Sequence, residues 1–483
     1  MTFEEARVYL RTRQGFHVKV GTRNIRAVAA ALGRPERRFP RVIVAGTNGK
    51  GSTVAIVESV LAALGLRVGR FTSPHLVSVR ERIRIGGREL APEVFAGHVA
   101  AVARAAASLP AEHQPSFFET ITATAFTAFA EARVDAAVFE VGMGGRWDAT
   151  TATDSPLGLV TRIALDHQRY LGPTVEAIAA EKGAVARPGG ELLAGVQVPS
   201  VVEVLRESAR SAGARFFDVG GECEARFAIG RSGSGGRLDT PEAGYDDLWL
   251  PLPGSHQVEN LTLAVRAVER FAARFGGGPP DPARLREGVA SVRWPGRLEW
   301  LREAPGCPRV LLDAAHNASG ADRLAAYLAG LGRERRPRVL LFGVTRDKPA
   351  EQMLASLLPH FDGVVFAEAA SRRARSSAEL LALAVPPASR NGEHGEAAAE
   401  AEPDLRAALR RVAERAGTRG EIVIAGSIYL LGDVLARLAA GVPGLPRASQ
   451  GRPGHPPDEA EPMPLGAGTA AAPTGGAGGR LRP

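Results

Sequence analysis

The chain has 483 residues, 45% of them hydrophobic and 23% charged, which predicts a globular protein of roughly two or three domains. Its formal net charge of +8 comes from basic residues scattered among acidic ones, so we do not expect it to bind nucleic acid. The two cysteines, Cys223 and Cys307, form no C-x-x-C pattern, so they indicate neither a disulfide framework nor a thiolate zinc site and fit a reducing cytoplasm.

The first segment, residues 1–20, contains acidic residues and lacks an uninterrupted apolar core, so it does not resemble a signal peptide. No apolar run in the chain approaches the roughly 20 residues that a membrane-spanning helix needs. We therefore expect a cytoplasmic protein with no membrane partner.

Short apolar runs alternate along the chain with longer segments of helical periodicity. These runs are VIVA at 42, AAVFEV at 136, LGLVTRI at 157, ELLAGV at 191, RVLLD at 309, RVLLFGV at 338, GVVFAE at 363 and EIVIAGS at 421. Continuous hydrophobic strands with helices between them indicate parallel sheets that are covered on both faces. The fold class predicted is α/β.

The segments that connect these apolar runs indicate where the domain boundaries lie. Residues 215–255 read as a hairpin region, and a helix follows in HQVENLTLAVRAVERFAARF. Turn-rich segments then place the main boundary near residue 295. We predict an N-terminal domain with a P-loop-type parallel sheet over 1–295 and a smaller, Rossmann-like C-terminal α/β domain over 296–440. Residues 441–483, rich in Pro, Gly and Ala, are predicted to be a disordered tail.

The segment VIVAGTNGKGSTVAIVESVLAALG, from residue 42, reads as a strand, a glycine turn and a helix. It departs from the Walker A pattern G-x-x-x-x-G-K-[ST], because Val44 replaces the first glycine and Gly51 replaces the hydroxyl residue. Backbone N–H groups and the helix dipole still converge on one point, and Lys50 adds a positive charge. A helix-capping turn through Ser52 or Thr53 is the alternative, but it does not explain a lysine among glycines.

Two further strands end in groups that suit a cation. Glu140 ends one strand, and Asp166 and His167 follow another. Ligands of α/β proteins bind at the carboxyl ends of strands, where a glutamate can hold Mg²⁺. A salt-bridged glutamate and a structural histidine remain the alternatives. Lys182 lies on a predicted helix and, taken alone, would be a surface lysine.

Together these segments resemble the folylpolyglutamate synthase and dihydrofolate synthase family, a branch of the Mur ligase superfamily. The resemblance runs from residue 16 to GSIYLLGDV at 426. Its motifs, in order, are VAGTNGKGST, FTSPHL, FFE, EVGMGGRWDAT, IALDH, GSHQVEN, PGRLE, DAAHN and GVTRDK.

The resemblance implies a bifunctional ATP-dependent ligase of folate biosynthesis. Such an enzyme adds L-glutamate to the carboxylate of dihydropteroate or of a folate through an acyl phosphate. It implies two Mg²⁺ ions, with a monovalent cation as a further cofactor, and a monomer whose N-terminal domain binds ATP.

The resemblance also assigns residues. Those expected to bind ATP are Gly49, Lys50, Gly51, Ser52, Asn260, Arg297 and Asp313. Those expected to bind Mg²⁺ are Ser73, Glu140 and His167. Those expected to contact the pterin-bearing substrate are Gly21, Thr22, Ser116, Phe117, Phe118, Glu119, Trp147, Asp148 and Ala149. Those expected to act in catalysis are Lys50, Lys182, which falls at the family's carbamylated lysine, and His316, a candidate base.

Some residues depart from the family's pattern. Thr22 and Trp147 stand where leucine is common, and Lys182 is followed by Gly-Ala-Val in place of Ala-Gly-Ile. Phe117, Phe118 and Trp147 could also be core residues.

Two other functions are alternatives for a chain with this glycine loop. A peptidoglycan-type Mur ligase carries a nucleotide-sugar domain before the phosphate loop, whereas only residues 1–41 precede its strand here. A P-loop ATPase or kinase without ligase chemistry would not need the predicted metal residues together with Lys182 and Asp313.

Overall fold

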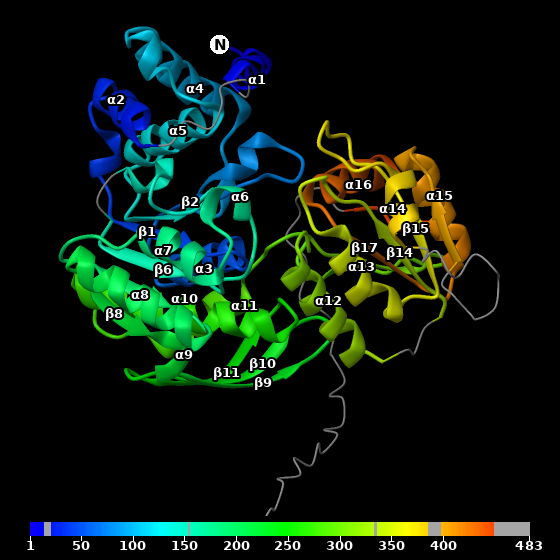
Figure 1. The fold of residues 1–483 in the computed structure, drawn as a ribbon. Coiled ribbons are helices and arrows are strands. Elements are labelled where there is room, and N and C mark those ends of the chain that lie inside the picture. Colours follow the sequence, from blue (N-terminus) through cyan, green and yellow to red (C-terminus); the bar gives the residue numbers. More distant parts are fainter. Residues whose placement is uncertain (14–20, 153–154, 333–335, 385–397, 449–483) are drawn as a thin grey trace, which may run out of the picture. The chain divides into compact units, whose positions relative to one another are not determined.

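The computed structural model describes residues 1–13, 21–152, 155–332, 336–384 and 398–448. Within these residues the strands form sheets of eight, three and six strands, so the predicted α/β class is confirmed (Figure 1). All eight apolar runs expected to be strands lie in the two larger sheets. The start of the family resemblance, residues 16–20, lies outside the described residues.

The eight-stranded sheet has the order β4-β3-β2-β5-β1-β6-β7-β8. Its strands are β1 (Arg41–Ala45), β2 (Val68–Phe71), β3 (Ile83–Ile85), β4 (Arg88–Glu89), β5 (Ala136–Glu140), β6 (Leu157–Val160), β7 (Glu191–Ala194) and β8 (Arg215–Asp218). The strands from β2 to β8 run parallel, whereas β3 and β4 are antiparallel additions at one edge. The central strands β1 and β5 are buried along their whole length, which explains their unbroken apolar sequences.

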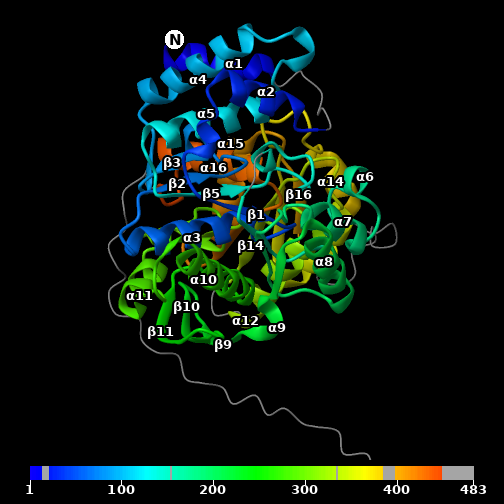
Figure 2. The same ribbon diagram turned by 90° about the vertical axis from the view of Figure 1, so that its left-hand side faces the viewer.

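Helices cover both faces of this sheet. One hydrophobic core contains residues of α1 (Phe3–Thr12), α2 (Arg23–Ala31), α4 (Pro92–Ala107), α5 (Phe117–Glu131), α7 (Val175–Gly183) and α8 (Pro199–Ala212). The core on the other face contains residues of α3 (Lys50–Ala63), α10 (Ser255–Phe275) and α11 (Pro282–Ala290). Figure 2 shows α3, α10 and α11 together, away from α1, α2, α4 and α5. Because α3 packs between the sheet and two helices, most of its side chains are buried.

The predicted hairpin region forms a small antiparallel sheet of the order β11-β10-β9. Its strands are β9 (Glu224–Ile229), β10 (Ser234–Asp239) and β11 (Gly244–Leu250). Two short helices complete this half of the chain, α6 (Gln168–Leu171) after β6 and α9 (Val219–Glu222) after β8.

The six-stranded sheet has the order β12-β13-β17-β14-β15-β16, and only β12 runs antiparallel within its described residues. Its strands are β12 (Glu299–Trp300), β13 (Arg309–Leu312), β14 (Arg338–Phe342), β15 (Gly363–Phe366), β16 (Ala398–Ala401) and β17 (Glu421–Ala425). One face packs against α12 (Ala318–Gly330), α13 (Ala350–Leu357) and α14 (Ser377–Ala384). The other packs against α15 (Leu405–Ala416) and α16 (Ile428–Ala440).

The hydrophobic core continues beyond the predicted end of the folded chain at Ala440. Val442 and Leu445 are each only 6% exposed and belong to the same core as α15 and α16. The prediction of a tail from residue 441 is therefore wrong for residues 441–448, because these two apolar side chains find a core to enter. The rest of the predicted tail, residues 449–483, lies outside the described residues.

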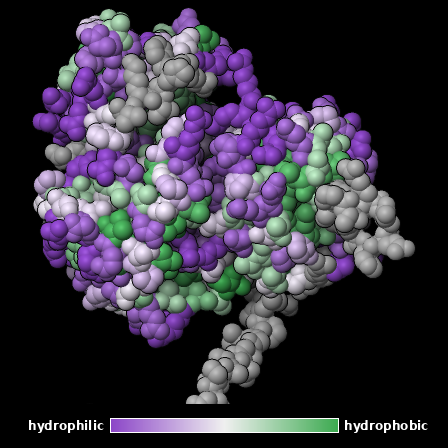
Figure 3. All heavy atoms as spheres, in the orientation of Figure 1, coloured by the Kyte–Doolittle hydropathy of each residue, from purple (hydrophilic) through white to green (hydrophobic). Residues whose placement is uncertain are grey.

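On the face drawn in Figure 3, hydrophilic residues predominate and hydrophobic ones are scattered between them. Across the described parts of the chain, no helix is both long enough and apolar enough to cross a membrane.

Candidate active site

Four neighbouring parallel strands bring the predicted motifs to one edge of the large sheet. In the order β2, β5, β1, β6 these strands lie side by side, so their carboxyl ends meet. Ser73 follows β2, Glu140 ends β5, the loop 46–49 follows β1, and residues 161–167 follow β6. The strand order places this edge where ligands of open α/β sheets bind.

The loop 46–49 needs glycine at two positions. Gly46 has a φ of +145°, and a Cβ there would lie 1.8 Å from Thr161 Oγ1. Gly49 has a φ of +89° and begins α3, and a Cβ there would lie 2.2 Å from Asn260 Oδ1. The helix-capping alternative is wrong, because Gly49 is the N-cap and no side chain caps the helix. The N–H groups at this helix start thus remain available to an anion.

Two lysines contact this loop through backbone carbonyls. Lys50 Nζ donates to the carbonyl oxygens of Gly46 and Thr47, at 3.1 Å each. Lys182 Nζ donates to the carbonyl oxygen of Gly46 at 2.8 Å. Lys182 is only 5% exposed, so the surface-lysine alternative is wrong. Burial, together with the charge of Lys50, lowers the pKa of Lys182 to about 7.

Glu140 is a buried carboxylate close enough to Lys50 for the two charges to interact. It is 5% exposed and accepts a hydrogen bond from the backbone N–H of Ser73 at 2.9 Å. Burial raises the pKa of Glu140, and the positive charge of Lys50 partly opposes this rise. In the described chain Glu140 has no salt bridge, so its charge is not neutralised by direct contact with a cation.

The third residue predicted to bind Mg²⁺ has a different environment. His167 is exposed and adopts a left-handed backbone conformation with a φ of 51°. Desolvation by the surrounding protein lowers its pKa, Asp166 opposes this, and the charges of Lys348, Lys50 and Lys182 lower the pKa further. No group of three His, Cys, Asp or Glu side chains suited to a metal occurs in the described residues. A lone carboxylate and a hydroxyl fit Mg²⁺ that is held jointly with phosphate oxygens and water.

A buried polar cluster connects the carboxyl ends of the two larger sheets. Asp166, after β6, lies 2.6 Å from Lys348 Nζ, and both side chains are at most 10% exposed. Asp166 also accepts a hydrogen bond from Asn317, which in turn is hydrogen-bonded to Asn48 of the loop 46–49, the predicted phosphate loop. Although burial alone would raise the pKa of Asp166, Lys348 and these contacts hold it well below its usual range. We call Asn48, Asp166, Asn317 and Lys348 the bridging cluster.

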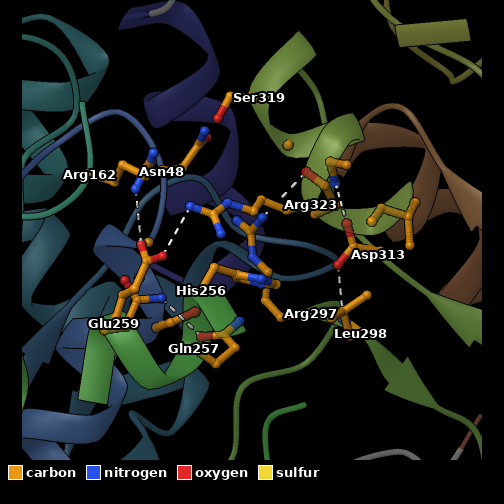
Figure 4. A pocket seen from close by; sticks show the side chains of 18 of the residues that line it. Asn48, Arg162, His256, Gln257, Glu259, Arg297, Leu298, Asp313, Ser319 and Arg323 are labelled. Carbon is orange, nitrogen blue, oxygen red and sulfur yellow. Dashed lines mark hydrogen bonds and ion pairs between the residues drawn. The ribbon is translucent and has the colours of Figure 1, made fainter. Parts of the chain in front are cut away.

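A polar pocket lies beside the bridging cluster (Figure 4). It encloses about 680 Å³ of empty space, part of it open to solvent. Six of the seven predicted ATP-binding residues line it: Gly49, Gly51, Ser52, Asn260, Arg297 and Asp313. Lys50, the seventh, contacts the phosphate loop from outside this lining, and the predicted catalytic residue His316 is also part of the wall. The structure therefore places most of the residues predicted to bind ATP, and one of those predicted to act in catalysis, around a single pocket. These residues come from both halves of the chain.

Backbone contacts fix the carboxylate of Asp313 in this pocket. It accepts hydrogen bonds from the N–H groups of Leu298 and Ala315, at 2.9 Å each. Figure 4 shows Asp313 directed toward Leu298, with Arg297 between it and His256. Burial raises the pKa of Asp313, and the charge of Arg297 opposes this rise.

The two histidines of the pocket are neutral at ordinary pH. Burial and the charge of Lys348 lower the pKa of His316 to about 4, and burial and Arg323 lower that of His256 to about 3. Neutral His316 has a ring nitrogen 2.8 Å from the carbonyl oxygen of Ala314. Its other ring nitrogen is then free to accept a proton.

Among the residues predicted to contact a pterin, some make their hydrogen bonds within the protein, whereas others are open to solvent. Ser116 and Glu119 form a capping box at the start of α5. Asp148 is buried and accepts four hydrogen bonds, from Gly142, Met143 and the N–H and hydroxyl of Thr150. These side chains shape loops, and their hydrogen-bonding capacity is largely used within the protein.

The remaining members of this set differ in exposure. Phe118 is half-buried and lies 5.8 Å from the ring of Phe71, as a core residue would. Trp147 is 54% exposed, so the alternative that it packs in the core is wrong. Phe117 is half-buried, and Ala149 is buried. Gly21 and Thr22 precede α2, where the Thr22 hydroxyl accepts a hydrogen bond from Arg26.

Sequence reasoning missed the bridging cluster as a unit. Asn48, Asn317 and Lys348 belong to the motifs VAGTNGKGST, DAAHN and GVTRDK, and Asp166 precedes His167 in IALDH, but the sequence does not indicate that the four side chains meet. The available signal was that GVTRDK and DAAHN each follow an apolar strand, as the phosphate loop does. The contact itself could not be inferred, because Asp166 and Lys348 lie 182 positions apart in the sequence and only the arrangement of the strands brings them together.

Comparison with known proteins agrees with this geometry. Residues 44–268 match the sequence profile of the Mur ligase middle domain, and residues 302–437 match that of the dihydrofolate synthetase C-terminal domain. A phosphate loop on a parallel sheet, followed by a second α/β unit that shares its pocket, is thus the architecture of a Mur-ligase-type protein.

Whole-chain similarities specify the family. The chain is 39% identical over 435 residues to the dihydrofolate synthase/folylpolyglutamate synthase of Mycobacterium tuberculosis, a match that covers 84% of this chain and 88% of the relative. It therefore belongs to the dihydrofolate synthase/folylpolyglutamate synthase family, as its motifs predicted.

Solved structures show the same relationship. Mycobacterium tuberculosis folylpolyglutamate synthase complexed with ADP aligns with a TM-score of 0.82 and 36% identity, covering 91% of this chain and 98% of that one. E. coli FolC in complex with DHPP and ADP aligns with a TM-score of 0.78 and 28% identity, with the same coverage.

Proposed function

We propose that the protein is an ATP-dependent ligase that adds L-glutamate to the carboxylate of dihydropteroate and of folates, in folate biosynthesis. The observation that carries this proposal is the shared edge at which the phosphate loop, Glu140 and Ser73 lie, next to a pocket that Asp313 and His316 complete. Relatives with the same architecture are named for these activities or were solved with ADP.

In the proposed reaction, an oxygen of the substrate carboxylate attacks the γ-phosphorus of ATP. The new O–P bond gives an acyl phosphate, and ADP leaves with the electrons of the broken P–O bond. The amino nitrogen of glutamate then attacks the acyl carbon, an amide forms, and inorganic phosphate leaves. Catalysis of such transfers is mainly positioning and stabilisation of charge.

The chain's own residues have distinct proposed tasks. Gly49, Gly51 and Ser52 hold the phosphates at the start of α3, and Lys50 neutralises charge that develops on them. Asn260, Arg297 and Asp313 hold the rest of the nucleotide in the pocket. Mg²⁺, held through Ser73, Glu140 and His167 together with phosphate oxygens, would supply further charge neutralisation. His316, neutral at physiological pH, can accept the proton that the attacking amine releases.

We propose that Lys182 is carbamylated. A lysine reacts with CO₂ in its neutral form, and a pKa of about 7 leaves much of Lys182 neutral at physiological pH. A carbamate would place a negative charge beside Lys50, where the lysine now places a second positive one. Carbon NMR of the protein in buffer that contains ¹³C-bicarbonate should show one carbamate signal, and this signal should be missing from Lys182→Met. The same signal in the variant would refute the assignment.

We further infer two domains that meet near residue 295, since separate sheets lie on each side of it. We place the enzyme in the cytoplasm as a monomer, and both cysteines are free thiols, as a reducing compartment would leave them. Size-exclusion chromatography with light scattering would test the monomer directly.

The proposed function is tested by glutamate-dependent ADP release. Dihydropteroate and tetrahydrofolate should each be supplied separately, and we expect both to support turnover. Turnover with only one would restrict the enzyme to one of the two activities. ATP hydrolysis that ignores glutamate and both carboxylate substrates would contradict the ligase assignment.

A further inference from the structure

Arg82 is a buried arginine on the loop that joins β2 to β3. It ends the short helical turn Val79–Arg82 and is 7% exposed. Its Nε donates a hydrogen bond to His75 Nδ1 at 2.8 Å, and its guanidinium lies 5.2 Å from the centre of the Phe117 ring. These two contacts hold the guanidinium plane in one orientation.

The charge of Arg82 is not neutralised within the protein. Among the other buried arginines, Arg70, Arg266 and Arg338 each form a salt bridge with a glutamate at 2.9 Å or less. Arg82 has no salt bridge in the described chain, and its terminal amino groups donate no hydrogen bond to the described residues. A buried cation without a partner is costly, and burial lowers the pKa of Arg82 to about 10. Such a group is a ready receptor for an anion.

The surroundings of Arg82 indicate which anion. Phe117, against which the guanidinium lies, is predicted to contact the pterin-bearing substrate. Glu140, at the edge of the sheet that carries the loop 46–49, is near enough for the charge of Arg82 to help lower its pKa. Tyr429, at the start of α16, is also near enough to affect Arg82. A substrate that extends from Phe117 toward the γ-phosphate of ATP would carry its reacting carboxylate past this guanidinium.

We propose that Arg82 binds the reacting carboxylate of the dihydropteroate or folate substrate and positions it for attack on the γ-phosphorus. This inference rests on the proposed function. Two N–H groups of a guanidinium match the two oxygens of a carboxylate, and the charge-assisted hydrogen bonds formed are strong.

His75 supports this role as a positioning residue. Its Nδ1 accepts from Arg82, so the ring is neutral, with its proton assigned to Nε2. Burial and the charge of Arg82 lower the pKa of His75 to about 4, which keeps the ring neutral at physiological pH. A protonated ring would lose the acceptor that holds the Arg82 side chain in place.

The test compares Arg82→Gln and Arg82→Lys with the control Arg84→Gln. Arg84, two residues away, is half-buried and pairs with Glu89 at 3.5 Å, so it has a partner of its own. Binding of dihydropteroate and of an analogue with hydrogen in place of the carboxylate should be measured by calorimetry. ADP binding to each variant checks that the fold and nucleotide site are intact.

We expect Arg82→Gln to weaken dihydropteroate binding by about 10- to 100-fold, the range for hydrogen bonds to a charged group. Binding of the decarboxylated analogue and of ADP should change less than about twofold, and Arg82→Lys should fall between. Arg84→Gln should behave as the wild type does.

Two results would overturn the inference. One is an equal loss for dihydropteroate and its decarboxylated analogue, which would mean that Arg82 only supports Phe117. The other is unchanged dihydropteroate binding in Arg82→Gln. If the wild type itself failed to bind dihydropteroate and folates, the proposed function would fail instead.

Discussion

Two groups of buried charges flank the phosphate loop, and they differ in how those charges are satisfied. In the bridging cluster, Asp166 and Lys348 are in direct contact, and Asn317 completes their hydrogen bonding. At the other group, Lys50 and Lys182 donate only to backbone carbonyls, and Glu140 accepts from one backbone N–H.

Charges that are paired within the protein stabilise the fold, whereas charges that are left unpaired are suited to bind a ligand. Removing one partner of a buried ion pair destabilises the protein, because the other charge then stays buried without a partner. An unsatisfied charge already costs stability and is offset when a substrate or cation arrives. The following predictions test that distinction.

The largest effect is expected for Lys50→Ala. Loss of this positive charge at the phosphate loop should lower kcat for glutamate-dependent ADP release by at least about 10²- to 10³-fold. The free energy of unfolding of the ligand-free protein should not fall, because Lys50 has no salt-bridge partner within the described residues. Normal glutamate addition by the variant would refute the phosphate-loop assignment.

Next, Lys348→Met should destabilise the fold by about 3 kcal/mol in chemical denaturation, since it leaves Asp166 buried and unpaired. Adding Asp166→Asn should recover part of this loss. The matched control is Arg210→Met, which removes the exposed pair with Glu207 on α8 and should cost far less stability, because solvent screens an exposed pair. An equal loss of unfolding free energy in Lys348→Met and Arg210→Met would contradict the proposed difference between the buried and the exposed pair.

Lys182→Met should show a stability difference that depends on pH. The pKa of Lys182 is about 7 in the folded protein and near 10.5 in the unfolded chain. Between these values the unfolded chain binds more protons, so wild-type stability rises with pH. The variant should thus be more stable than the wild type at or below pH 7, by a few kcal/mol at most, since one pKa unit corresponds to about 1.4 kcal/mol.

This advantage should shrink toward pH 10 when unfolding is measured in CO₂-free buffer. A difference that stays constant across this range would mean that Lys182 keeps an ordinary pKa.

The smallest effects concern the C-terminus. Truncation after Ala448 should leave both activity and the melting temperature unchanged. Truncation after Ala440 removes the buried side chains of Val442 and Leu445 and should cost about 2 kcal/mol of stability, while kcat stays near the wild-type value. Identical melting temperatures for the two truncations would show that these side chains contribute nothing.

Much of the fold could be predicted because its central strands are buried on both sides and therefore read as unbroken apolar runs. The short strands β3, β4 and β12 gave no such signal, because a strand of two or three residues is too short for its hydrophobic pattern to be recognised. Val442 and Leu445 were assigned to the tail because composition averages over a segment and overlooks two apolar residues that reach a core.

For the site, motifs identified residues one at a time, but strand order decides which of them meet. The sequence placed Glu140 and the phosphate loop at strand ends, and the order β2-β5-β1-β6 made them neighbours. The contact of Asp166 with Lys348 and the unpaired charge of Arg82 cannot be predicted from the sequence. Both depend on which side chains pack around these residues in the fold.

The measurement that tests the central claim most directly follows oxygen through the reaction. Dihydropteroate labelled with ¹⁸O in its carboxylate should be turned over with ATP and glutamate, and the released phosphate analysed by mass spectrometry. An acyl phosphate passes one carboxylate oxygen to the phosphate, so we predict one ¹⁸O in phosphate for each amide formed. Amide formation with unlabelled phosphate would contradict the account.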